Sequence, residues 1–118
     1  MRVKIYHNPR CSKSRQTLQL LQERGIAPEI IDYLDHPPSI DELESILQLL
    51  KLEPRELMRR QESEYKALGL DDPLLSREIL IESMVNSPKL IERPIVINQD
   101  NAKAALGRPP EAVLAILD

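Results

Sequence analysis

Cys11 is the residue of this sequence best placed to do chemistry, and it is the single cysteine of the chain. It follows an alternating stretch, residues 3–6, that predicts a short strand, and a helix is predicted to begin at Cys11 or Ser12. The free backbone N–H groups of residues 12–14 should then point at the sulfur. Nearby lie three cationic side chains: Arg10, Lys13 and Arg15. Together these groups should lower the pKa of the thiol and favour the reactive thiolate, whereas the alternative is an inert buried cysteine.

The spacing around Cys11 excludes several kinds of site. A phosphatase loop needs an arginine six residues after the cysteine, but that position holds Thr17. A dithiol motif needs a second cysteine at the position of Ser14, so the sequence has a monothiol C-x-x-S pattern. Between a strand and a helix, this pattern favours a thioredoxin-like redox site. One cysteine and two scattered histidines, His7 and His36, are too few for a metal site, and none is predicted.

The elements around this site predict an α/β fold. The first helix should end near Arg24–Gly25, and a second strand is predicted over 28–34. The helix between the strands is long enough to make them parallel. Near the end of the chain, strands are predicted over 94–97 and 103–106, paired as a hairpin, and a last helix should start within 107–111.

The middle of the chain is predicted to be mainly helical. Ser39 and Glu42 form a capping box, which starts a helix with its apolar residues on one face. Pro54 should begin a short helix carrying residues 57–60, residues 65–70 form a further turn, and Ser76 should cap a helix that ends at Ser87–Pro88. The predicted order is therefore β-α-β, helices, β-β-α, in a single domain spanning residues 1–118.

Composition narrows the function further. The chain has 118 residues, 42% of them hydrophobic, a formal net charge of −3, and no Trp or Phe. This charge balance gives no basic surface for nucleic acid or anionic membrane. No stretch has the length of a membrane span, and the first residues lack the pattern of a signal peptide. A chain with one cysteine cannot form an internal disulfide, so a cytoplasmic location is expected.

The segment from Ile5 to Arg15 closely resembles the active-site stretch of the glutaredoxin-coupled arsenate reductases of the ArsC family, particularly the YfgD-like branch. The resemblance extends along nearly the whole chain, through residues 33–34, 57–59, 92–96 and 107–111. It implies a thioredoxin-like fold with a mixed four-stranded sheet and a helical insertion, which agrees with the predicted element order.

The resemblance also implies a set of site residues. The family binds arsenate with one cysteine and three arginines, which match Cys11 and the residues Arg59, Arg93 and Arg108; a shift of one position would exchange Arg59 for Arg60. His7 matches a histidine near the thiol, and Ser12 and Ser14 lie at the helix start that would bind the oxyanion. Pro94 matches the cis-proline that faces the cysteine. The alternatives are ordinary surface charges for the arginines and a structural hydrogen bond for His7.

The activity implied is reduction of arsenate to arsenite through a covalent thiol–arsenate adduct at Cys11. No bound cofactor is expected; glutathione would be the external reductant and glutaredoxin a partner. Two other functions stay open: a glutathione-dependent thiol oxidoreductase with another substrate, and a regulator that binds RNA polymerase, like the Spx proteins. Ser14 breaks the C-x-x-C switch that is usual in Spx proteins. Family membership alone does not identify the substrate.

Overall fold

The computed structural model describes residues 1–117 of the chain, and these residues form two compact units. One unit combines Met1–His36 with the segment from Arg93 onward, and it contains Cys11. The other unit, Pro37–Glu92, is inserted between these two segments and is mainly helical. None of the helices in residues 1–117 combines the length and hydrophobicity of a transmembrane span.

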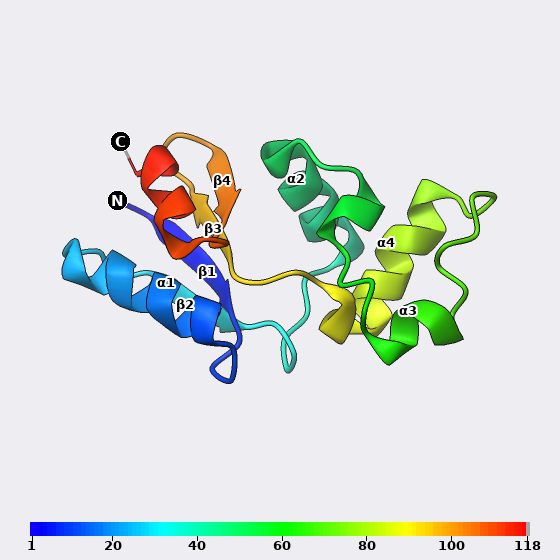
Figure 1. Ribbon diagram of the computed structural model, residues 1–118. Helices are drawn as coiled ribbons and strands as arrows, with labels where there is room; N and C mark the ends of the chain where they lie inside the picture. The colour runs from blue at the N-terminus through cyan, green and yellow to red at the C-terminus, as the bar shows by residue number, and fades with distance from the viewer. Residues whose placement is uncertain (118) are drawn as a thin grey trace. The chain divides into compact units, whose positions relative to one another are not determined.

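The first unit is built on one four-stranded sheet, whose strands lie in the order β2-β1-β3-β4 (Figure 1). The strands are β1 (Val3–His7), β2 (Glu29–Asp32), β3 (Ile95–Asn98) and β4 (Lys103–Leu106). β1 pairs parallel with β2 and antiparallel with β3, and β3 and β4 form the predicted hairpin. The parallel pair is possible because α1 (Ser12–Glu23) returns the chain between β1 and β2. The α/β class, the mixed sheet and its thioredoxin-like arrangement are therefore confirmed.

β2 is shorter than the predicted strand over 28–34. It ends at Asp32, because the backbone N–H groups of Asp35 and His36 both donate to the carbonyl of Asp32 and turn the chain away from the sheet. Tyr33, which the sequence placed in the strand, lies in this turn and is buried.

An aliphatic core holds α1 and the C-terminal 3-10 helix η3 (Pro110–Ile116) against the sheet (Figure 1). Its buried members are Val3, Ile5, Leu21, Val96, Val113 and Ile116. Each such side chain contributes roughly 1.5–3 kcal/mol on burial. Because side chains alternate along a strand, His7 at the end of β1 shares a face with Val3 and Ile5. The start of α1 lies beside the end of β1, because the Ser14 side chain bonds His7 and the N–H of Asn8.

The inserted unit contains α2 (Ile40–Leu50), η1 (Pro54–Leu57), α3 (Ser63–Ala67), α4 (Arg77–Asn86) and η2 (Pro88–Leu90). The predicted capping box is confirmed: Ser39 Oγ accepts the N–H of Glu42 at 3.1 Å, and Glu42 Oε1 accepts the N–H of Ser39 at 3.3 Å. α2 and α4 pack together through buried aliphatic side chains and Met84.

The helix predicted from Pro54 through residue 60 ends earlier, at Leu57. The chain then runs beside residues 90–92: Met58 pairs antiparallel with Ile91, and the N–H of Arg59 donates to the carbonyl of Leu90 at 2.7 Å. Strand-like pairing between distant segments therefore fixes the backbone of Arg59.

Candidate active site

Cys11 is the N-cap residue of α1, with extended backbone angles of φ −93° and ψ 122°. A tight turn presents it there: the N–H of Cys11 donates to the carbonyl of Asn8 at 3.0 Å, and the N–H of Arg10 donates to Asn8 Oδ1 at 3.0 Å. The first helical hydrogen bond runs from the N–H of Arg15 to the carbonyl of Cys11 at 3.0 Å. The sulfur therefore sits where the free N–H groups of the helix begin.

The surroundings of the sulfur are buried but polar. Cys11 is 8% exposed, and this burial raises the pKa of its thiol. The backbone N–H of Ser14, the hydrogen bond and charge of Arg93, and the backbone N–H of Lys13 act in the opposite direction. They outweigh burial, so the pKa of Cys11 lies below its ordinary value.

Ser14 and His7 form a hydrogen-bonded pair next to this site. Ser14 is fully buried, and its Oγ lies 2.6 Å from His7 Nδ1 and accepts the N–H of Asn8 at 3.0 Å. Burial lowers the pKa of His7, opposed by the charge of Asp32 and reinforced by that of Arg15. His7 is therefore neutral at neutral pH. The Ser14 side chain joins α1 to β1 and the turn, while that of Ser12 is exposed at the first position of α1.

Arg93 and Arg108 come together at one end of the β3–β4 hairpin. The Nη1 of Arg108 donates to the carbonyl of Arg93 at 3.3 Å, and the N–H of Gly107 donates to the carbonyl of Pro94 at 2.9 Å. The Arg93–Pro94 peptide bond is cis, and so is Arg108–Pro109, which the sequence did not predict. The first unit thus groups Cys11 with four of the residues named from the sequence: His7, Ser14, Arg93 and Arg108.

Arg59 belongs to the inserted unit and is 22% exposed. Its Nε donates to Glu62 Oε1 at 3.1 Å, and its Nη1 donates to Glu92 Oε1 at 3.0 Å. Burial lowers the pKa of Arg59, but the two carboxylates raise it by more. The pKa of Arg59 therefore lies above its ordinary value. Arg60 differs: its side chain donates to the backbone carbonyl of Arg55, at 3.4 Å.

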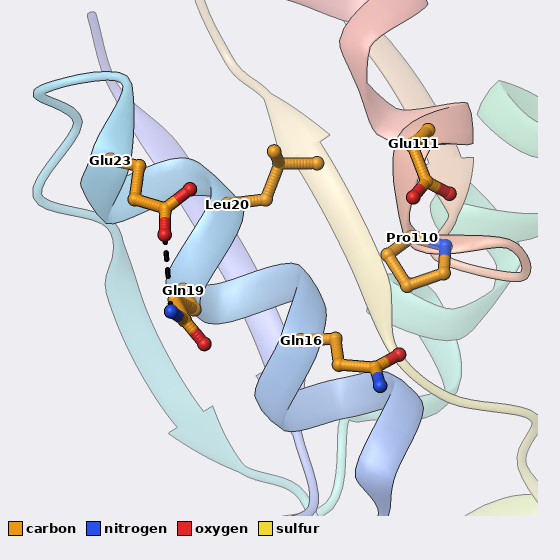
Figure 2. Close-up of a pocket in the computed structure, with 6 residues that line it drawn as sticks. All are labelled: Gln16, Gln19, Leu20, Glu23, Pro110 and Glu111. Atoms are coloured by element: carbon orange, nitrogen blue, oxygen red, sulfur yellow. Dashed lines mark hydrogen bonds between the residues drawn. The ribbon is translucent and has the colours of Figure 1, made fainter.

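A surface groove between α1 and η3 is lined by other residues than those named above (Figure 2). Its volume is about 320 Å³, and it is lined by Gln16, Gln19, Leu20, Glu23, Pro110 and Glu111. Gln19 Nε2 donates to Glu23 Oε1 at 3.1 Å. With two carboxylates and no cation in its lining, this groove would repel an oxyanion.

The arrangement around Cys11 suits nucleophilic chemistry on an anionic or electrophilic group. A thiolate is the nucleophilic form of cysteine, and backbone N–H groups and guanidinium groups also bind oxyanions. Within residues 1–117 there is no group of three or more His, Cys, Asp or Glu side chains that could hold a metal ion. Sequence reasoning missed the role of Asn8, whose Asn-Pro pair is a turn signal that was used only to end the strand.

Comparison with known proteins gives a consistent result. The chain matches the model of the ArsC family over residues 6–116. It is 55% identical to YfgD, an uncharacterized protein of Escherichia coli (strain K12), over 98% of this chain and 96% of that protein. It is 51% identical to the arsenate reductase of Neisseria meningitidis serogroup B, over 98% of this chain and 97% of that protein.

A solved structure of an arsenate reductase from Vibrio cholerae has the same fold. It superposes with a TM-score of 0.95 at 54% identity, covering 99% of this chain and 98% of that chain. The family match and these relatives extend over nearly the whole sequence, including the strand, turn and helix that carry Cys11. The chain therefore belongs to the ArsC family.

Proposed function

We propose that this protein reduces arsenate to arsenite, with Cys11 as the nucleophile. The observation that carries the proposal is the pair of backbone N–H groups, from Lys13 and Ser14, that together with the Arg93 guanidinium lower the pKa of Cys11. The same groups that stabilise a negative sulfur also attract a negative substrate. The family membership and the names of the relatives support arsenate as that substrate.

In the first step the Cys11 thiolate attacks arsenic. A sulfur–arsenic bond forms, and an arsenic–oxygen bond breaks as hydroxide leaves and takes up a proton to become water. Arg93 and Arg108 would hold the remaining oxygens, because a guanidinium group donates two parallel hydrogen bonds to such an anion. Ser12 and Ser14 would add the donors of the helix start. The proton comes from the protonated arsenate oxyanion, and His7, which is neutral at neutral pH, would accept it and pass it to the leaving hydroxide.

The electron balance requires a second thiol. Arsenate accepts two electrons to become arsenite, and these come from converting two thiols into one disulfide. The chain has a single cysteine, so glutathione is proposed as the external thiol that attacks the adduct, with glutaredoxin as the partner that completes the exchange. Overall, arsenate and two glutathione molecules give arsenite, glutathione disulfide and water. This chemistry needs no bound cofactor and fits the reducing cytoplasm.

Arg59 is proposed as a third substrate-binding residue, on the strength of the family resemblance. Its cation is held by Glu62 and Glu92, so it is already oriented by fixed partners rather than mobile in solvent. Arg60 is exposed and donates to a backbone carbonyl, with no carboxylate among the partners found within residues 1–117.

The proposal is tested by measuring arsenite formation with glutathione and glutaredoxin, for the wild type and for Cys11→Ser. We expect turnover by the wild type, none when glutathione is omitted, and only the uncatalysed background from Cys11→Ser. Thermal unfolding of the variant controls for loss of the fold. Full activity of Cys11→Ser, or turnover without added thiol, would contradict the mechanism. Thiol-exchange activity on disulfides without any arsenite would instead favour the oxidoreductase with another substrate.

A further inference from the structure

Gly107, the residue that follows β4, occupies a space with no room for a side chain. A Cβ at this position would collide with Thr17 Oγ1 and would lie 2.7 Å from Pro94 Cγ and 3.1 Å from Thr17 Cγ2. Real Cβ atoms almost never approach other heavy atoms to less than 3.0 Å. Gly107 therefore lets α1, through Thr17, and the start of β3, through Pro94, approach the same stretch of backbone.

Space rather than backbone conformation is what requires glycine here. The other two glycines of the chain, Gly25 and Gly69, have positive φ angles of 76° and 61°, and a Cβ on either would meet nothing within 4 Å. Gly107 has no such positive φ. Its N–H donates to the carbonyl of Pro94 at 2.9 Å. This hydrogen bond holds the backbone of Gly107 close to the start of β3.

Both neighbours of Gly107 lead to Cys11. Pro94 directly follows Arg93, the side chain that hydrogen-bonds the sulfur. Thr17 Oγ1 donates to the carbonyl of Lys13 at 2.8 Å, and the backbone N–H of Lys13 is another group that acts on the sulfur. Thr17 and Pro94 are thus the links by which a displacement at Gly107 would reach the thiol from two directions.

We propose that Gly107 is a positioning residue of the Cys11 site, because its missing side chain sets how closely the Arg93–Pro94 segment approaches α1. Gly107 does not touch the sulfur; it acts through Arg93 and Lys13. The inference deepens the proposed function, since it concerns the same thiol, but its first measurement needs no arsenate.

The test is the rate of alkylation of Cys11 by iodoacetamide as a function of pH, for the wild type and Gly107→Ala. The added Cβ should push Pro94 or Thr17 away, weaken the contact of Arg93 with the sulfur, and raise the pKa of the thiol. At a pH below the thiol pKa we expect the alkylation rate to fall about three- to tenfold, since there the thiolate fraction drops tenfold for each unit. The kcat/KM for arsenate should fall by up to about 100-fold, as for a misplacement of about 1 Å.

Gly25→Ala is the matched control, because it lies in the same unit and strains the backbone without crowding the site. It should lower the melting temperature and leave the alkylation profile of Cys11 unchanged. A rescue variant adds Thr17→Ala to Gly107→Ala and removes two of the three crowding atoms. Its profile should lie between those of the wild type and Gly107→Ala.

If Gly107→Ala does not fold, the double variant is compared with Thr17→Ala alone, and the remaining contact with Pro94 should still raise the pKa. A folded Gly107→Ala with the wild-type alkylation profile would overturn the inference. So would a double variant with the same profile as Thr17→Ala. A shifted profile in a protein that never forms arsenite would leave the positioning role intact and reject the proposed function instead.

Discussion

Arg93 and Arg59, two half-buried arginines in different units of the protein, interact with different kinds of partner. In the first unit, Arg93 hydrogen-bonds the sulfur of Cys11 and helps to lower its pKa. In the inserted unit, Arg59 is bonded to two carboxylates, those of Glu62 and Glu92. Arg93 therefore acts on the nucleophile in the free protein, whereas the charge of Arg59 is balanced by acidic partners.

This difference suggests that the two arginines have different functions. A cation that stabilises the thiolate changes the reactivity of the enzyme before any substrate arrives. A cation whose charge is balanced by carboxylates is proposed to contribute by binding the substrate oxygens instead. The first function is visible in thiol chemistry without arsenate, and the second only in the dependence of the rate on arsenate concentration.

Replacing Arg93 should have the largest effect. For Arg93→Ala we expect kcat/KM for arsenate to fall by about 100- to 1,000-fold, as when one donor to a developing anion is lost. The pKa of Cys11 should also rise, so the pH profile of its alkylation should shift to higher pH. Arg24→Ala, which removes an exposed charge at the end of α1, is the matched control and should change neither quantity. If a folded Arg93→Ala variant kept the thiol reactivity of the wild type, Arg93 would not act on Cys11, and its proposed difference from Arg59 would be wrong.

Replacing Arg59 should have a smaller effect, confined to substrate binding. For Arg59→Ala we expect the KM for arsenate to rise about tenfold, as for the loss of one hydrogen bond to a charged group. The alkylation profile of Cys11 should stay at its wild-type position. Because the variant leaves Glu62 and Glu92 without their shared cation, its melting temperature must be measured as well.

Arg60→Ala is the control for this prediction and also decides between two neighbouring residues. Arg60 is exposed and bonded to a backbone carbonyl, so its removal should leave the KM unchanged. A raised KM in Arg60→Ala together with a normal Arg59→Ala would reverse the assignment. A shifted thiol profile in Arg59→Ala would show that the two arginines act alike.

The sequence predicted those features that depend on neighbouring residues. The strand, turn and helix around Cys11, the capping box of Ser39 and Glu42, and the β3–β4 hairpin all follow from local patterns and were found where expected. Local patterns failed where the backbone pairs with a distant segment instead of continuing a helix. The helix after Pro54 stops at Leu57 because the following residues pair with residues 90–92 instead.

The contacts that define the site were beyond the reach of these patterns. The family resemblance named Arg93, but its hydrogen bond to Cys11 joins residues that are far apart in the chain. Gly107 was expected only as part of the segment that starts the last helix, because nothing in its sequence neighbours reveals that Thr17 and Pro94 pack against it. The ion pairs of Arg59 with Glu62 and Glu92 likewise required the folded structure.

The smallest effects on the pKa of Cys11 are expected from His7, which bonds Ser14 and differs from Arg93 in charge. Burial keeps the pKa of His7 below 6.5, so the ring is neutral at neutral pH and adds no cation to the site. His7→Asn, which retains a polar group to bond Ser14, should therefore leave the pKa of Cys11 nearly unchanged. Arsenate turnover should fall, because His7 is proposed to relay a proton. A large rise of the thiol pKa would mean that His7 is charged and shares the function of Arg93.

The pH dependence of stability provides an independent check on the state of His7. In the unfolded chain its pKa is about 6.5, and in the folded protein it is lower. As the pH falls through 6.5 and then through the lowered folded value, the unfolded chain binds more protons, so the free energy of unfolding decreases. His7→Asn should therefore lose less of its melting temperature between pH 7.5 and pH 5 than the wild type does. His36→Asn, at an exposed position, should behave as the wild type. An equal loss in all three proteins would show that burial does not keep His7 neutral, and the contrast with Arg93 would then depend on the thiol measurements alone.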